Sequence, residues 1–131
     1  MNPLNTLRTH DTLASEQDAV WQSVCSEQDL VINSGVVVWL DGAQVALFYL
    51  PDAQGKTLYA IDNHDPKSGA NVIGRGLIAD IKGELVVASP IYKQHFRLED
   101  GTCLEYPQQR LRVWPVRLSR GDVEIGCRGR G

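Results

Sequence analysis

The sequence predicts an all-β domain, a sandwich or barrel of short antiparallel strands. About nine short runs of β-type residues follow one another closely, and Gly-bearing dipeptides punctuate them. At 131 residues the chain has the size of a single domain. A chain of this size buries roughly two-thirds of its unfolded surface, so we expect a core that needs neither metal nor disulfide.

The strands are expected from Trp21 onward. Residues 36–40 and 44–50 flank Asp41-Gly42, a strong signal for a β-hairpin. Lys82-Gly83 and Arg120-Gly121 supply further turns. The remaining strands are expected in the runs TLYAI, LIADI, ELVVAS, HFRL, TCLE, LRVWPVRL and DVEI.

Two further local features are predicted. A short helical turn is expected over Ser26–Leu30, where Ser26 can cap the turn with the Asp29 carboxylate three residues later. Because large aromatic side chains dominate core burial, we assign five of them to the core: Trp21, Trp39, Phe48, Tyr49 and Trp114.

The ends of the chain differ from its middle. Residues 1–17 are polar and without periodicity, so we expect a flexible arm, followed by one domain over 18–127 and a short tail, 128–131. A net charge of −3 argues against a nucleic-acid partner, and no apolar run approaches the length of a membrane span. The polar N-terminus argues against secretion, and the three cysteines form neither a disulfide framework nor a thiolate cage. A cytoplasmic protein is expected.

Several motifs match a function only loosely. Gly74-Arg75-Gly76 with Ala79 resembles a dinucleotide-binding pattern, but it lacks the preceding strand and the following helix. Arg120-Gly121-Asp122 is interpreted as a hairpin turn. Ser89 has no Gly-x-Ser-x-Gly elbow, so a hydrolase triad with a histidine has no support.

Two histidines are candidate metal ligands. His64 has Asp62 and Asp65 as neighbouring oxygen donors, and His95 ends the second unusual loop. Metal sites need three or four convergent ligands, and no ligand spacing of that kind is present. Both histidines are therefore interpreted as solvated or hydrogen-bonded to the backbone.

Two segments lack the sequence pattern of a strand, residues 62–76 and 89–95. Two stretches that overlap these segments, YAIDNHDPKSGA (residues 59–70) and SPIYKQHFRLEDG (residues 89–101), resemble the two cluster-binding loops of the Rieske-type iron–sulfur domain. That family holds its cluster with Cys-x-His in one loop and Cys-x-x-His in the other. The resemblance implies a Rieske-type β fold.

The resemblance also places the four ligand positions, and none of them keeps its ligand. Asp65 and Ser89 stand at the two Cys positions, while Lys67 and Tyr92 stand at the two His positions. An iron–sulfur cluster of this type needs thiolate sulfur and neutral imidazole nitrogen. We therefore predict the fold without the cluster, with no catalytic, cofactor-binding or metal-binding residue in this chain.

A narrower resemblance runs from about Trp21 to Ile125. The ligand-free loops, the Trp21, Val24 and Cys25 start and the run RGLIADIKGELVVASPIYKQHFRL resemble the small subunits of cytoplasmic NAD(P)H-dependent nitrite reductases. The resemblance implies a large-subunit partner that reduces nitrite to ammonium with NADH and carries FAD, siroheme and an iron–sulfur cluster. It implies that the small subunit supports this activity without catalysing it.

The two loops are the expected contact with that partner. The expected contact residues, which are polar, cationic or apolar, are Lys67, Ile91, Tyr92, Lys93, Gln94 and His95. Two alternatives stay open: an independent module that binds a small molecule or a protein, and an electron-transfer ferredoxin, which the missing ligands argue against.

Overall fold

A computed structural model describes residues 19–128, and β-strands dominate this part of the chain. The two short 3-10 turns are η1 (Glu27–Asp29) and η2 (Ile73–Arg75). The strands are β2 (Ala19–Ser26), β3 (Gly35–Leu40), β4 (Ala43–Tyr49), β5 (Leu58–Asp62), β6 (Leu77–Ile81), β7 (Glu84–Ala88), β8 (His95–Arg97), β9 (Val113–Trp114), β10 (Val116–Ser119) and β11 (Asp122–Arg128). Within residues 19–128, no helix has the length and apolar character that crossing a membrane requires.

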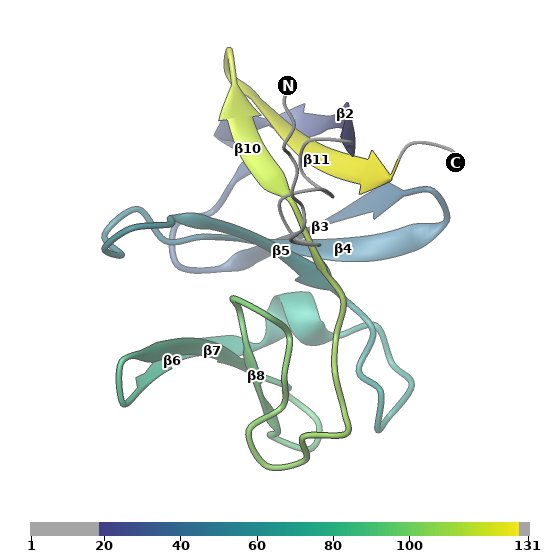
Figure 1. Cartoon of the computed structure of the whole chain (residues 1–131), viewed down its shortest axis with the longest axis vertical. Helices are drawn as coiled ribbons and strands as arrows, with labels where there is room; N and C mark the ends of the chain where they lie inside the picture. Colours follow the sequence, from purple (N-terminus) through teal and green to yellow (C-terminus); the bar gives the residue numbers. More distant parts are fainter. Residues whose placement is uncertain (1–18, 129–131) are drawn as a thin grey trace, which may run out of the picture.

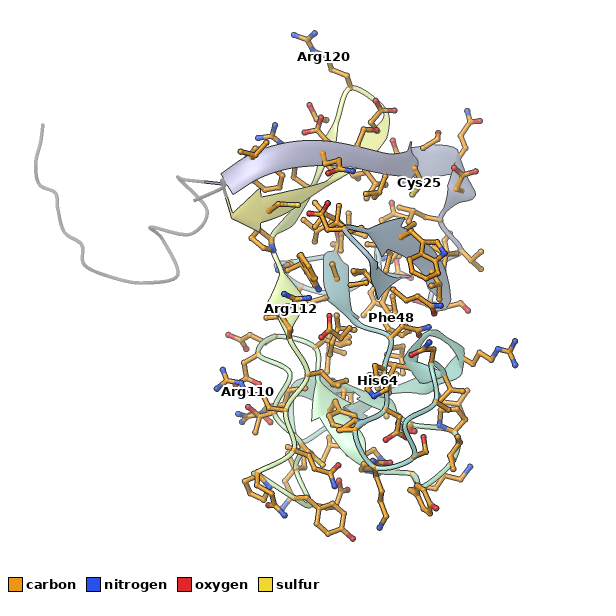
Figure 2. All side chains as sticks on the ribbon, turned by 90° about the vertical axis from the view of Figure 1, so that its right-hand side faces the viewer. Cys25, Phe48, His64, Arg110, Arg112 and Arg120 are labelled. Atoms are coloured by element: carbon orange, nitrogen blue, oxygen red, sulfur yellow. The ribbon has the colours of Figure 1, made fainter. Side chains whose placement is uncertain are left out.

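Three small sheets form three layers. Their strand orders are β10-β11-β2, β3-β4-β5-β9 and β6-β7-β8, and neighbouring strands in each are antiparallel. The first sheet lies at one end of the molecule, the second in the middle, and the third at the opposite end together with most of the long loops (Figures 1 and 2).

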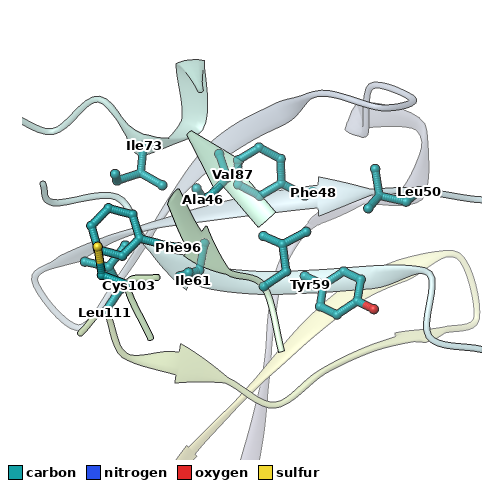
Figure 3. Close-up of a cluster of buried hydrophobic side chains, with 11 residues drawn as sticks. Ala46, Phe48, Leu50, Tyr59, Ile61, Ile73, Val87, Phe96, Cys103 and Leu111 are labelled. Carbon is teal, nitrogen blue, oxygen red and sulfur yellow. The ribbon is translucent and has the colours of Figure 1, made fainter. Parts of the chain in front are cut away.

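The middle sheet is buried on both faces, and its sequence shows why. Along β4, Val45 and Leu47 belong to the apolar cluster shared with the β10-β11-β2 sheet. The alternate residues, Ala46 and Phe48, belong to the cluster on the other face (Figure 3). Successive side chains of a strand point to opposite faces, so burial on both sides requires an unbroken apolar run.

The predicted two-residue hairpin is confirmed. Asp41 and Gly42 have φ values of 50° and 80°, and Leu40 pairs with Ala43. Positive φ at both central residues matches the twist of the flanking strands. Lys82-Gly83 and Arg120-Gly121 form turns of the same kind.

The predicted helical turn is also confirmed, as η1. The Ser26 hydroxyl accepts a hydrogen bond from the Gln28 N–H at 3.1 Å, and the Asp29 carboxylate accepts one from the Ser26 N–H at 2.9 Å. The predicted arm, residues 1–17, lies outside the described residues. Strand β11 ends at Arg128, one residue into the segment expected as a tail.

Three expectations about strands and core were wrong. The run TCLE forms no strand: it makes only isolated antiparallel bridges, from Cys103 to Phe96 of β8 and from Thr102 to Arg110. Pro115 divides the run LRVWPVRL into β9 and β10, since proline has no N–H for a strand ladder. Trp39 is 65% exposed: it lies on the edge strand β3, on the same side as the exposed Val37, whereas the next residue, Leu40, is buried.

Candidate functional site

One loop leaves the β3-β4-β5-β9 sheet and another leaves the β6-β7-β8 sheet. They meet at the end of the molecule opposite the β10-β11-β2 sheet (Figure 1). The first loop, residues 63–72, follows β5, and the second, residues 89–94, follows β7. They contain the four positions that the sequence assigns to lost cluster ligands. Contacts between these four positions join the two loops.

Both loops are closed by the same backbone turn. In the first, the Asp65 N–H donates to the Ala70 oxygen, and the Asp65 oxygen accepts from the Gly69 N–H, both at 2.8 Å. The second loop repeats this pattern from Ser89, at 2.9 and 3.0 Å. The fourth residue after the start of each turn has a positive φ, 78° at Gly69 and 64° at Lys93. The two cysteine positions of the family pattern therefore occupy equivalent places in two equivalent turns.

A buried hydrogen bond joins these equivalent places. Asp65 and Ser89 are both fully buried, and the Ser89 hydroxyl donates to Oδ2 of Asp65 at 2.5 Å. A hydrogen bond from a hydroxyl to a carboxylate is charge-assisted and stronger than one between neutral groups. It connects residues 24 positions apart in the chain and so fixes the second loop against the first.

The other carboxylate oxygen, Oδ1 of Asp65, accepts three further hydrogen bonds. Two come from within the first loop, from the Lys67 N–H at 2.8 Å and the Ser68 N–H at 3.3 Å. The third comes from the side-chain amide of Gln94 in the second loop, at 3.0 Å. With four donors around it, the buried carboxylate has the compensation that a buried charge needs.

These donors shift the pKa of Asp65. Burial is the largest single influence and raises the pKa, because it disfavours the charged form. The hydrogen bonds from Ser89, from the Lys67 and Ser68 N–H groups and from Gln94 act in the opposite direction. Together they outweigh burial and hold the pKa of Asp65 below its ordinary value.

A pH dependence of stability follows from this lowered pKa. A carboxyl group whose pKa is lower in the folded state stabilises the fold above its unfolded pKa of about 4. The contribution is lost as the pH falls through the folded value. We expect the difference in unfolding free energy between the wild type and Asp65→Asn to narrow when urea denaturation is measured at pH 3 instead of pH 7. A difference that is constant or larger at pH 3 would contradict this assignment.

The two former histidine positions also pair across the loops, and they do so at the surface. The Lys67 ammonium lies 4.7 Å from the centroid of the Tyr92 ring and 5.5 Å from that of Tyr106. All three side chains are exposed. A cation over an aromatic face is attracted by the ring quadrupole, by about 0.5–1 kcal/mol at exposed sites. The site thus has two parts. One is the buried, hydrogen-bonded pair of Asp65 and Ser89, and the other is the exposed Lys67 with its two tyrosine rings.

These side chains do not fit an iron–sulfur cluster. The oxygens of Asp65 and Ser89 are hydrogen-bonded to each other, and neither supplies the soft thiolate that iron in such a cluster requires. Lys67 offers a cation where a neutral imidazole nitrogen is needed. In the part of the chain that the structure describes, no group of three or more His, Cys, Asp or Glu side chains is placed to hold a metal ion.

The two histidines considered as metal ligands lie apart and have local partners. His64 is exposed, and its Nδ1 lies 3.1 Å from the Asn71 side-chain oxygen. Nδ1 of His95 lies 2.6 Å from Oε2 of Glu105, whose other oxygen accepts from the His95 N–H at 2.8 Å. His64 is exposed, as expected, but the ring of each histidine is hydrogen-bonded to a side chain and not to the backbone.

Gly74-Arg75-Gly76 has a structural role. It forms the end of η2, and the Gly74 N–H donates to the buried Asn63 side chain at 2.6 Å. A Cβ on Gly74 would lie 2.8 Å from the Val37 side chain, so the glycine permits η2 to pack on β3. The turn interpretation of this motif is therefore confirmed.

Sequence reasoning missed two members of the site. Gln94 was expected at the contact surface, but its side chain is 1% exposed and lies in the buried network. Tyr106 was not singled out, because it belongs to a third loop that is far from the other two in sequence. The inward position of Gln94 had one signal in the sequence. Gln94 lies five residues after Ser89, where the backbone turn that begins at Ser89 closes.

The layered fold and this pair of loops define a Rieske-like domain. The model of the family described as "Rieske-like [2Fe-2S] domain" matches residues 20–126. The chain is 42% identical over 107 residues to the nitrite reductase (NADH) small subunit of Salmonella typhimurium, covering 80% of this chain and 95% of that protein. The solved structure of the Escherichia coli protein NirD superposes with a TM-score of 0.74 at 38% identity, covering 83% of this chain and 97% of that one.

A third relative differs in length. The nitrite reductase [NAD(P)H] large subunit of Klebsiella oxytoca is 41% identical over 106 residues, which are 81% of this chain but 11% of that protein. The chain belongs to the family of nitrite reductase (NADH) small subunits. The all-β Rieske-type fold and the family predicted from the sequence are both confirmed.

Proposed function

We propose that this chain is the small subunit of an NAD(P)H-dependent nitrite reductase and supports the reduction of nitrite to ammonium in the cytoplasm. The large subunit is the catalytic partner in this proposal and carries FAD, siroheme, an iron–sulfur cluster and the NADH site. The observation that carries the proposal is the 42% identity over 95% of the Salmonella typhimurium small subunit.

The geometry of the two loops supports a role without electron transfer. The family's four ligand positions hold a hydrogen-bonded oxygen pair and a cation–aromatic pair, and neither pair supplies the thiolate and imidazole ligands that hold the family's cluster. The small subunit therefore acts on the large subunit through contact. The electron-transfer ferredoxin stays the least favoured alternative for the same reason.

The Klebsiella oxytoca relative supports a direct association with the large subunit. There, a region like this chain occupies 11% of a protein named as the large subunit. Two modules within one polypeptide are present in equal number and at high effective concentration. We propose that the separate chain associates with its large subunit in the same one-to-one ratio.

The test is an assay of the large subunit with and without an equimolar amount of this chain. We expect NADH-dependent nitrite reduction to rise by about fivefold or more, the lower end of typical coupling between two protein sites. The added chain should show no visible absorption of its own. If the rate is unchanged and the two proteins do not associate, the independent binding module becomes the better interpretation. Visible absorption with about two iron atoms per chain would favour the ferredoxin.

A further inference from the structure

We propose that the large subunit docks an acidic segment onto the loop-end surface, which we define as Lys67, Ile91, Tyr92, Lys93 and Tyr106. This inference rests on the proposed function and names the contact through which the small subunit would act. The surface lies at the end of the molecule farthest from the β10–β11 hairpin (Figure 1). Its parts come from three loops that the fold brings together.

Lys67 gives this surface a fixed positive charge. Its ammonium lies 4.7 Å from the Tyr92 ring centroid and 5.5 Å from that of Tyr106, so two rings restrict where it points. Within residues 19–128, no carboxylate oxygen lies within 4 Å of it. The rings attract the cation without neutralising it, and the ammonium keeps N–H donors for a carboxylate from outside.

The surrounding charges make this surface unusual for the chain. The protein carries a net charge of −3, yet the second loop adds another exposed cation, Lys93, directly after Tyr92 in the chain. Two carboxylates that neighbour the surface residues in the chain are already engaged: Asp65 is buried with four donors, and Glu105 is paired with His95. Charge complementarity therefore selects an acidic partner segment.

Apolar contact area is present around the two cations. Ile91, Tyr92 and Tyr106 are 45%, 54% and 42% exposed. Tyrosine is among the side chains that contribute most at protein interfaces, where it combines apolar area with a polar hydroxyl. A partner segment that sets apolar side chains around a carboxylate matches this composition.

The buried network prepares the surface before binding. Ser89 and Gln94 fix the second loop to Asp65 in the first loop, so Tyr92 is held against Lys67. A surface that is ordered in advance loses less conformational entropy on association.

The experiment is a binding titration of the purified large subunit with the full-length chain and its variants, at about 50 mM and 300 mM salt. We expect Lys67→Met to weaken binding about 10-fold and Lys67→Glu about 100-fold, within the range of interface hot spots. Both should make the affinity less salt-dependent. Lys67→Arg keeps the charge and still stacks on aromatic rings, so it should bind within about twofold of wild type.

Matched controls lie on the far hairpin. Arg120, at the hairpin tip, is exposed and points away from the molecule (Figure 2). Arg120→Glu should change the affinity less than about twofold. Ile91→Ser should weaken binding, while Leu118→Ser, at a similar exposure of 39%, should not.

The outcomes separate the two proposals. If the wild type binds and Lys67→Glu weakens binding no more than Arg120→Glu does, the loop-end surface is not the docking site, and the proposed function stands. If Lys67→Arg binds as weakly as Lys67→Met, the contact at Lys67 does not depend on positive charge, and the acidic docking segment is excluded. If the wild type does not bind the large subunit at all, both proposals are wrong.

Discussion

Asp65→Ala is expected to lower the free energy of unfolding by about 4 kcal/mol. The substitution removes the acceptor of four hydrogen bonds. It leaves the Ser89 hydroxyl buried without that acceptor and leaves the Gln94 amide only its 3.2 Å hydrogen bond to the Gln109 side chain. Each buried polar group left unsatisfied costs about 1–3 kcal/mol, and the relief of one buried charge offsets part of the sum. Urea denaturation at neutral pH measures the difference.

The control for this substitution is Asp52→Ala. Asp52 is also a loop aspartate, but it is exposed and takes part in none of the side-chain hydrogen bonds found in residues 19–128. Surface substitutions of this kind change stability by about 0.5 kcal/mol or less. Equal losses from the two variants would show that the Asp65 network contributes nothing specific to stability.

Gly101→Ala is expected to cost about 3 kcal/mol of unfolding free energy. Gly101 has a φ of 80°, where an L-residue is destabilised by about 1–2 kcal/mol. In addition, a Cβ at this position would overlap the backbone oxygen and carbon of Leu111. Since the Leu111 N–H donates to the Gly101 oxygen at 2.9 Å, the two backbones cannot separate without breaking this bond. Thermal unfolding followed by circular dichroism is the measurement.

Gly83→Ala separates the two contributions. Gly83 has a similar φ, 86°, but no atom lies within 4 Å of where its Cβ would be. It should lose only the backbone contribution of about 1–2 kcal/mol. If Gly101→Ala is no more destabilising than Gly83→Ala, the close approach to Leu111 is not a constraint on the fold.

Local patterns were sufficient for much of the fold. The Asp41-Gly42 turn, the Ser26 capping box and the unbroken apolar run of β4 each depend on neighbours within a few residues. A strand buried on both faces and a two-residue turn have distinct sequence patterns, so these elements could be predicted without the structure.

The rest of the candidate site depends on contacts between distant segments. The four ligand positions could be assigned in sequence, but their pairing as Asp65 with Ser89 and Lys67 with Tyr92 spans 24 and 25 residues. Nothing local indicates that Gln94 turns inward or that Tyr106 reaches Lys67. The exposure of Trp39 could not be predicted either, because the sequence of a strand does not show whether that strand lies at the edge of its sheet.

The pairing of the four positions also determines how the protein would respond to substitutions that introduce cluster ligands. Each of the four side chains has its partner at another of the four positions, so introducing one Cys or His ligand alone leaves the other member of its pair without a partner. Asp65→Cys would leave the hydrogen-bond donors around the carboxylate without their acceptor. Ser89→Cys would replace the hydroxyl, a strong hydrogen-bond donor, with a thiol, a weak one. Until all four positions change, no iron site compensates for these losses. Stepwise conversion of this chain into a cluster-binding protein is therefore expected to pass through less stable intermediates, so single substitutions at these positions cannot introduce the cluster gradually.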